Sequence, residues 1–299
     1  MSAPAAAAAA ESKQPLTQPK ESTIRKMTRL AIQHGAVNLS QGFPNEGPQY
    51  DMVWGAVGAL VGGTPEGIER MEDLTVSSLL RPGEDSAAVS LKELLSRAQS
   101  ELDMFNQYSF PMGTNELRLA ISDYTERFYK FRPDPMEEVT VVLGATEGFA
   151  TAIRAVCDPG DAVAFFQPFH ELYPSQVSIF HLRGVSCTLT EDTASGRWAF
   201  DRDELTTKLR GTGVKAFLLN TPHNPTGKVF SAEEMDYLCT LFKEEGIVCI
   251  TDEIYEHILF PPHKHICAAT LPGMRDNTLV VQSGPCTGGL GRCICVMKA

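Results

Sequence analysis

Several features that would point to particular environments or partners are missing from this sequence of 299 residues. Apolar stretches such as residues 162–166 and 216–219 are as long as strands and far too short to span a bilayer, so we expect no membrane association. The sequence has no block or stripe of Lys and Arg, and its formal net charge is −11. Nucleic acid is therefore not an expected partner.

The amino-terminal residues 1–21 lack the apolar core of a secretory signal, and they contain no arginine. They are rich in Ala, Pro, Gln and Lys, which predicts a disordered lead. The eight cysteines form no regular framework, which favours a reducing compartment. We therefore expect a cytoplasmic protein, with import into an organelle left open. The cysteines in apolar contexts are predicted to be small core residues: Cys157, Cys187, Cys239, Cys249 and Cys267.

What the sequence does contain is a regular alternation of strands and helices from residue 138 onward. Continuous apolar runs predict strands at residues 139–143, 162–166, 215–219, 247–250 and 278–281. Helices are predicted between them, including residues 147–156 and 231–245. This pattern predicts an α/β fold, in which a mostly parallel sheet carries helices on both faces. Ligands of such sheets bind beyond the carboxyl ends of the strands.

The region before this alternation is predicted to be helical in parts. Residues 22–34 have apolar side chains at helical spacing, with Ser22 as a cap and Gly35 as a stop signal. A second helix is predicted at residues 115–128. Residues 54–96 contain Gly and Pro breakers with helical pieces between them.

A phosphate-binding turn is predicted where the first strand of the alternation meets its helix. Gly144 allows the backbone to turn, and the first amides of the helix after it favour an anion. Ala145 and Thr146 begin that helix, and Thr146 adds a hydroxyl group. A plain strand-to-helix junction explains the same residues, so this signal is weak by itself.

Asp252 follows a buried strand, and a buried carboxylate is costly unless it is paired or hydrogen-bonded. A protonated pyridinium nitrogen would satisfy it, and a helix cap or a salt bridge is the alternative. Tyr255 lies one helical turn further on, and Asn224 lies in a loop between Pro222 and Pro225. Both could hydrogen-bond a phenolate oxygen of the same ring, although Asn224 also suits a simple Asn-Pro turn.

Taken together, residues 144–146, 168–170, 224–227 and 252–255 resemble the motifs of the class I/II (fold-type I) aminotransferases, which depend on pyridoxal 5′-phosphate (PLP). Residues 38–44 and 105–108 look like the kynurenine/glutamine/methionine aminotransferase group. The resemblance extends over residues 24–281. It implies transfer of an amino group from an amino acid to a 2-oxo acid by a homodimer.

The resemblance also implies roles for single residues. Ala145 and Thr146 would bind the cofactor phosphate, and Tyr108 would reach the phosphate of the partner subunit. His170 would stack on the pyridine ring, with Phe169 as the alternative. The remaining implied contacts are Asp252 with the ring nitrogen, Asn224 and Tyr255 with the ring oxygen, and Gly42 and Asn224 with the substrate.

The sequence departs from the family at the lysine that should bond the cofactor aldehyde. The expected position falls at or beside Cys286, and no lysine occurs between Lys264 and Lys298. A frameshift or intron read-through near Gln282, a short deletion, or a functional cysteine would each explain this. We therefore expect no catalytic residue and no transaminase activity in this chain. A non-catalytic PLP-fold protein that binds cofactor or dimerises, and a cysteine-conjugate β-lyase, are the alternatives.

The resemblance further implies a division of the chain into three parts. Residues 1–21 would be the lead, residues 22–48 an arm and part of the small domain, and residues 49–299 the PLP-binding large domain. Residues 54–96 are longer than the family usually has at this place. The carboxyl-terminal part of the small domain is expected to be missing.

Overall fold

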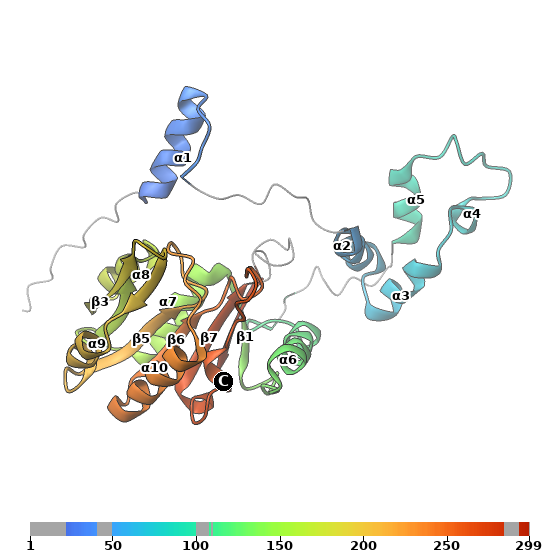
Figure 1. Cartoon of the computed structure of the whole chain (residues 1–299). Helices are drawn as coiled ribbons and strands as arrows, with labels where there is room; N and C mark the ends of the chain where they lie inside the picture. Colours follow the sequence, from blue (N-terminus) through green and yellow to red (C-terminus); the bar gives the residue numbers. More distant parts are fainter. Residues whose placement is uncertain (1–21, 41–49, 100–107, 109, 284–292, 299) are drawn as a thin grey trace, which may run out of the picture. The chain divides into compact units, whose positions relative to one another are not determined.

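The computed structural model describes residues 22–40, 50–99, 108, 110–283 and 293–298 (Figure 1). Gly42 and Cys286, two positions singled out in the sequence, lie outside these residues. The chain forms two compact units, Met1–Phe43 and Pro44–Ala299. The predicted division at residues 21 and 48 stays a prediction.

In the first unit, helix α1 (Thr23–His34) has the ends that the sequence predicts. The Ser22 hydroxyl accepts a hydrogen bond from the Arg25 amide at 3.3 Å, which satisfies one of the free amides at the helix start. Gly35 ends the helix in the left-handed conformation, at φ 60°. Local capping chemistry therefore sets both boundaries.

Residues 50–99 form the helical pieces predicted for this region. They are α2 (Tyr50–Gly62), α3 (Pro65–Asp73), α4 (Val76–Leu79) and α5 (Leu91–Ala98). The turn from α2 into α3 brings two glycines together. A Cβ atom added to Gly67 would lie 1.9 Å from the carbonyl oxygen of Gly62, so only glycine fits there.

Gly67→Ala is accordingly expected to open the α2–α3 turn, with a loss of about 1–3 kcal/mol in local stability. Amide hydrogen exchange over residues 50–73 measures this loss. Gly55→Ala is the matched control, because a Cβ atom at Gly55 meets nothing within 4 Å and alanine favours the helix. Equal exchange in the two variants would contradict the role given to Gly67.

The second unit also contains an eight-stranded sheet with the strand order β1-β8-β7-β6-β5-β2-β3-β4. Strands β3, β2, β5, β6 and β7 run parallel, whereas β8 pairs antiparallel with both β7 and β1, and β4 pairs antiparallel with β3. The mostly parallel sheet predicted from the sequence is confirmed. The strands are β1 (Val139–Leu143), β2 (Ala162–Gln167), β3 (Arg183–Asp192), β4 (Arg197–Phe200), β5 (Val214–Asn220), β6 (Val248–Asp252), β7 (Thr278–Ser283) and β8 (Cys293–Lys298).

One helix of this part precedes the first strand, and the others lie between strands. The helices are α6 (Asn115–Tyr129), α7 (Gly144–Val156), α8 (Leu172–Ile179), α9 (Arg202–Leu209) and α10 (Ala232–Glu245), with short 3-10 turns at Ala268–Thr270 and Arg275–Asn277. All five predicted strands and the predicted helices are present. Strands β3 and β4 and helices α8 and α9 were not predicted, and β8 lies in the tail whose match to the family the sequence left open.

Alternate side chains of the central strands pack on opposite faces of the sheet. Phe166 and Phe217 lie in one core cluster with the buried face of α10. Phe165 and Leu218 lie in the other cluster, with the buried face of α7. The sheet is thus covered on both faces, as Figure 1 shows for α7 and α10. This burial explains why the parallel strands are continuous apolar runs in the sequence.

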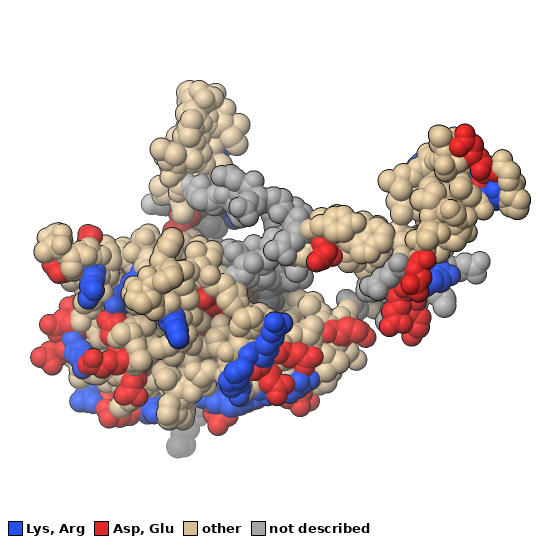
Figure 2. Space-filling model, turned by 45° about the vertical axis from the view of Figure 1, so that its right-hand side comes forward, with Lys and Arg blue, Asp and Glu red and all other residues tan. Residues whose placement is uncertain are grey.

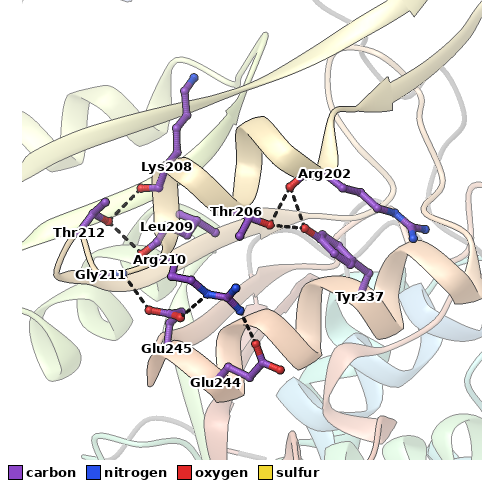
Figure 3. Close-up of polar contacts among 10 residues, drawn as sticks. All are labelled: Arg202, Thr206, Lys208, Leu209, Arg210, Gly211, Thr212, Tyr237, Glu244 and Glu245. Carbon is purple, nitrogen blue, oxygen red and sulfur yellow. Dashed lines mark hydrogen bonds and ion pairs between the residues drawn. The ribbon is translucent and has the colours of Figure 1, made fainter.

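Helices α9 and α10 are joined by polar contacts at both ends (Figure 3). Arg210 donates to Glu244 at 2.6 Å and to Glu245 at 3.0 Å, while the amide of Gly211 donates to Glu245 at 2.9 Å. At the other end, the Tyr237 hydroxyl donates to the carbonyl of Arg202 at 2.8 Å. These contacts align α9 with α10, the helix that precedes β6.

The five cysteines predicted to be core residues are all buried and free. Burial raises the pKa of Cys157 to about 11 and the pKa of Cys239 to about 12, so both thiols stay protonated. In the described part of the chain, no helix is both long and apolar enough to cross a membrane. Figure 2 shows acidic and basic side chains interspersed on the visible face of the sheet region.

Candidate active site

The site begins where β5 and β6 end side by side. Asn220 and Asp252 are register partners, and the side-chain amide of Asn220 donates to the backbone carbonyl of Asp252 at 3.0 Å. The amide of Thr221 donates to the same carbonyl at 2.9 Å. The loop after β5 is thereby fixed to the acid after β6, at the carboxyl edge of the sheet where the sequence predicts a ligand.

The carboxyl group of Asp252 is buried, with 6% of the residue exposed. The Tyr173 hydroxyl donates to its Oδ2 atom at 2.6 Å, while Oδ1 is buried and has no hydrogen-bond partner among the described residues. Burial raises the pKa of Asp252 to about 6, against the opposing effect of the Tyr173 hydroxyl and the Ile254 amide. A buried acceptor without a donor is costly, and a protonated ring nitrogen at Oδ1 would satisfy it.

Tyr173 is the residue of this site that sequence reasoning missed. It lies on α8, is 2% exposed, and packs edge-on to Phe149 with ring centroids 5.6 Å apart. Tyr173 and Asp252 are 79 positions apart in the sequence. Only the position of Tyr173, shortly after the loop that follows β2, could have drawn attention to it.

Asn224 and Tyr255, the two residues predicted to hold a ring oxygen, are in contact. The side-chain amide of Asn224 donates to the Tyr255 hydroxyl at 3.3 Å. The backbone amide of Asn224 donates to the side-chain oxygen of Asn220 at 2.6 Å, which holds the loop between the two prolines against β5. The structure thus brings these two residues together and links them to the strand that pairs with the one ending in Asp252.

The predicted phosphate turn lies at the start of α7. Gly144 has φ 83°, a conformation that favours glycine, and Leu143 provides no side-chain cap for the helix. Thr146 is exposed, and its carbonyl accepts from the side-chain amide of Gln176 on α8 at 2.6 Å. The carboxylate of Glu147 accepts from the amide of Leu143, so one acidic group already lies at this helix start.

His170 and Phe169, the two candidates for ring stacking, have different surroundings. The ring of His170 lies 6.3 Å from that of Tyr173, the residue that bonds Asp252. The Leu172 amide donates to its Nδ1 atom at 3.3 Å, and burial lowers the pKa of His170, which favours a neutral imidazole. Phe169 instead packs against Phe165 at 5.3 Å and faces an open hollow lined by Leu189 and Trp198.

Tyr108 is fully exposed in the single chain, so the structure does not bring it together with the other site residues of the same chain. Its predicted contact is with a partner subunit, which stays a prediction.

A second buried polar cluster supports the segment after Asp252. Oε2 of Glu253 lies 2.7 Å from Nε2 of His265, and Glu256 accepts from the Tyr124 hydroxyl at 2.7 Å and from the Gln282 side-chain amide at 2.9 Å. Ligand atoms of Glu253, Glu256 and His265 lie within 4.8 Å of one another, a spacing that a metal ion could use. Because these groups already bond protein partners, they form an internal network that joins β6, β7 and α6.

Comparison with known proteins decides the family. The model of the family described as aminotransferase class I and II matches residues 71–284. The chain belongs to this family. The resemblance inferred from the motifs is thereby confirmed, and PLP is the cofactor of this family of enzymes.

Among curated proteins, this chain is similar to kynurenine–oxoglutarate transaminase 3 of Rattus norvegicus. The two are 32% identical over 264 residues, which cover 86% of this chain and 49% of the rat protein. The chain therefore spans about half the length of the curated relatives it matches.

Two solved structures have the same fold over nearly the whole chain. N-succinyldiaminopimelate aminotransferase from Mycobacterium tuberculosis matches with a TM-score of 0.75 and 28% identity, covering 96% of this chain and 64% of that one. YbdL from Escherichia coli, which is described as having a methionine aminotransferase function, matches with a TM-score of 0.69 and 26% identity. This match covers 94% of this chain and 63% of that one.

Proposed function

We propose that this chain contains the cofactor-binding residues of a PLP-dependent aminotransferase. The whole protein would transfer an amino group from an amino acid of the kynurenine, glutamine or methionine type to a 2-oxo acid. The single observation that carries the proposal is the Asp252 carboxyl group. It is buried at the carboxyl edge of the sheet, bonded at Oδ2 and without a partner at Oδ1 among the described residues.

The other residues around Asp252 fit the same ligand. The start of α7, with Ala145 and Thr146, would hold the phosphate, because a helix N-terminus favours an anion. Asn224 and Tyr255 would hold the ring oxygen, and His170 would cover the ring. When bound, PLP supplies the electron sink of the reaction, and these side chains bind and orient it.

For the chain as it stands, we propose binding without turnover. No lysine occurs between Lys264 and Lys298, although the family places its catalytic lysine near Cys286. A thiol there could add to an aldehyde, but it could not move a proton as a lysine amine does. A non-catalytic PLP-fold protein is therefore the second candidate function.

Substrate, partner and location follow from the same proposal. Gly42 would contact the substrate carboxylate, and Tyr108 would reach the cofactor phosphate of a second copy in a homodimer. The full exposure of Tyr108 in the single chain supports a contact outside its own subunit. The free buried cysteines support a reducing compartment such as the cytoplasm.

Binding of pyridoxamine 5′-phosphate (PMP) tests the proposed function, because PMP carries no aldehyde and needs no lysine. We expect PMP to bind with one site per chain in calorimetry and to raise the melting temperature of the protein. Pyridoxamine without the phosphate is the matched ligand, and it should bind at least tenfold more weakly. Absence of PMP binding would contradict the proposed function.

Borohydride treatment of the chain with PLP separates the two candidate functions. If another lysine of the chain forms the Schiff base with PLP, reduction should attach the pyridoxyl group to that lysine alone. Peptide mass spectrometry would identify the labelled lysine. We expect no specific lysine to be labelled, as the non-catalytic candidate requires. Stoichiometric labelling of one lysine would overturn that candidate and restore the catalytic one.

A further inference from the structure

We propose that Tyr173 is a positioning residue of the cofactor site. Its hydroxyl holds Oδ2 of Asp252, so that Oδ1 would be left to pair with the ring nitrogen of a bound cofactor, and this bond would favour the proton on the nitrogen. The inference rests on the proposed function, since it concerns the same site.

The contact is short and fully enclosed. The hydroxyl oxygen of Tyr173 lies 2.6 Å from Oδ2, with Tyr173 2% and Asp252 6% exposed. Packing alone would be served by a phenylalanine, because the ring of Tyr173 lies among apolar and aromatic side chains of the core. A buried hydroxyl is costly unless it is bonded, so its presence here points to the carboxyl group that it contacts.

The ring of Tyr173 has little freedom to move away from this acid. Its centroid lies 5.6 Å from that of Phe149 on α7 and 6.3 Å from that of Phe165 on β2. Three positions along α8, Gln176 donates to the carbonyl of Thr146 at 2.6 Å. Residues three apart share a helix face, so one face of α8 contacts both the acid and the proposed phosphate turn.

The hydroxyl acts on Asp252 as a donor that does not lose its proton. Burial and the Asp252 carboxylate raise the pKa of Tyr173 well above its usual value, and the nearby Tyr255 acts in the same direction. Donation from Tyr173 lowers the pKa of Asp252, whereas burial and the Glu253 carboxylate raise it. Tyr173 is thus the side chain that favours the ionised form of this acid.

One proton is shared between the Asp252 carboxyl group and the ring nitrogen of a bound cofactor. If the carboxyl group holds it, the nitrogen is neutral; if the nitrogen holds it, the site contains a carboxylate facing a pyridinium. A hydrogen bond to the charged form of a group favours that form. The Tyr173 hydroxyl therefore shifts the proton toward the nitrogen, with no bond made or broken elsewhere.

The test is the protonation of PMP labelled with 15N in its ring, bound to the full chain. Protonated and neutral ring nitrogens differ widely in 15N chemical shift, so a pH titration of the complex gives the pKa of the bound nitrogen. In Tyr173→Phe, we expect this pKa to fall by about one to two units, the size of a hydrogen bond to a charged group. PMP affinity should fall about tenfold above that pKa.

Tyr237→Phe is the matched control, because it removes a tyrosine hydroxyl that bonds Arg202 on α9 (Figure 3). It should leave the 15N titration unchanged. Incorporation of 3,5-difluorotyrosine at position 173 keeps the shape and strengthens the donor, so it should raise the nitrogen pKa above that of the wild type. If Tyr173→Phe does not fold, the difluorotyrosine variant alone tests whether the Tyr173 hydroxyl sets the pKa of the bound ring nitrogen.

An unchanged 15N titration in both position-173 variants, with PMP still bound, would overturn the role of Tyr173 and leave the proposed function intact. Failure of the wild type to bind PMP would overturn the proposed function and this inference with it. A purely structural role would lower the melting temperature of Tyr173→Phe without moving the nitrogen pKa, and it would also overturn the inference.

Discussion

Asp252→Ala should abolish the binding of PMP, with a loss of affinity of about 100-fold or more. The ring nitrogen would lose its counter-charge in a buried position, where removing one partner of a charge pair costs about 2–5 kcal/mol. The prediction concerns only the affinity for PMP, so it does not require the chain to be catalytically active.

Calorimetric titration with PMP measures this loss in the wild type and the variant side by side. Asp236→Ala is the matched control, since Asp236 is an exposed aspartate on α10. It should bind PMP like the wild type. If Asp252→Ala retained wild-type affinity, the assignment of Asp252 to the ring nitrogen would be wrong.

Much of this site could be predicted because local rules decide it. Asp252 follows a short run of apolar residues that predicts a buried strand, so its neighbours in the sequence already indicated its burial. The Ser231 cap of α10 is similarly local. Its hydroxyl accepts from the amide of Glu234, the Glu234 carboxylate accepts from the amide of Ser231, and Gly246 ends the helix. Asn224 and Tyr255 meet because the strands before them pair.

The rest depends on contacts between distant segments. The bond between Tyr173 and Asp252 joins positions 79 residues apart, and no periodicity of α8 marks Tyr173 as a site residue. Strand β3 (Arg183–Asp192) begins and ends with exposed residues, and its last part pairs with β4. Its sequence therefore lacks the continuous apolar run that identified the buried strands.

Asp252→Asn should stabilise the cofactor-free chain at pH 8. The carboxyl group of Asp252 is ionised there, although burial raises its pKa from 3.8 to about 6. Two units of pKa correspond to about 3 kcal/mol, which is the order of the cost of keeping this charge buried. An amide of the same shape avoids the charge and can still accept from the Tyr173 hydroxyl.

The stability gained by Asp252→Asn over the wild type should increase as the pH rises. Between about pH 4 and pH 6 the folded wild type binds more protons than the unfolded chain, so its free energy of unfolding falls as the pH rises. Below the unfolded pKa of 3.8 the acid becomes protonated in both states, and the pH-dependent part of the difference from Asp252→Asn should disappear. Urea unfolding at pH 4, 6 and 8 measures it, and a difference that does not change with pH would contradict the buried charge.

Adding PMP should reverse the order of stability. The wild type gains the binding free energy of a ligand that pairs with its carboxylate, whereas Asp252→Asn offers the ring nitrogen no charge and should gain little. Asp252 would then lower the free energy of unfolding of the cofactor-free chain and also supply the charge that binds the cofactor. If Asp252→Asn gained as much stability from PMP as the wild type does, the cost of burying Asp252 would have to be explained by something other than this ligand.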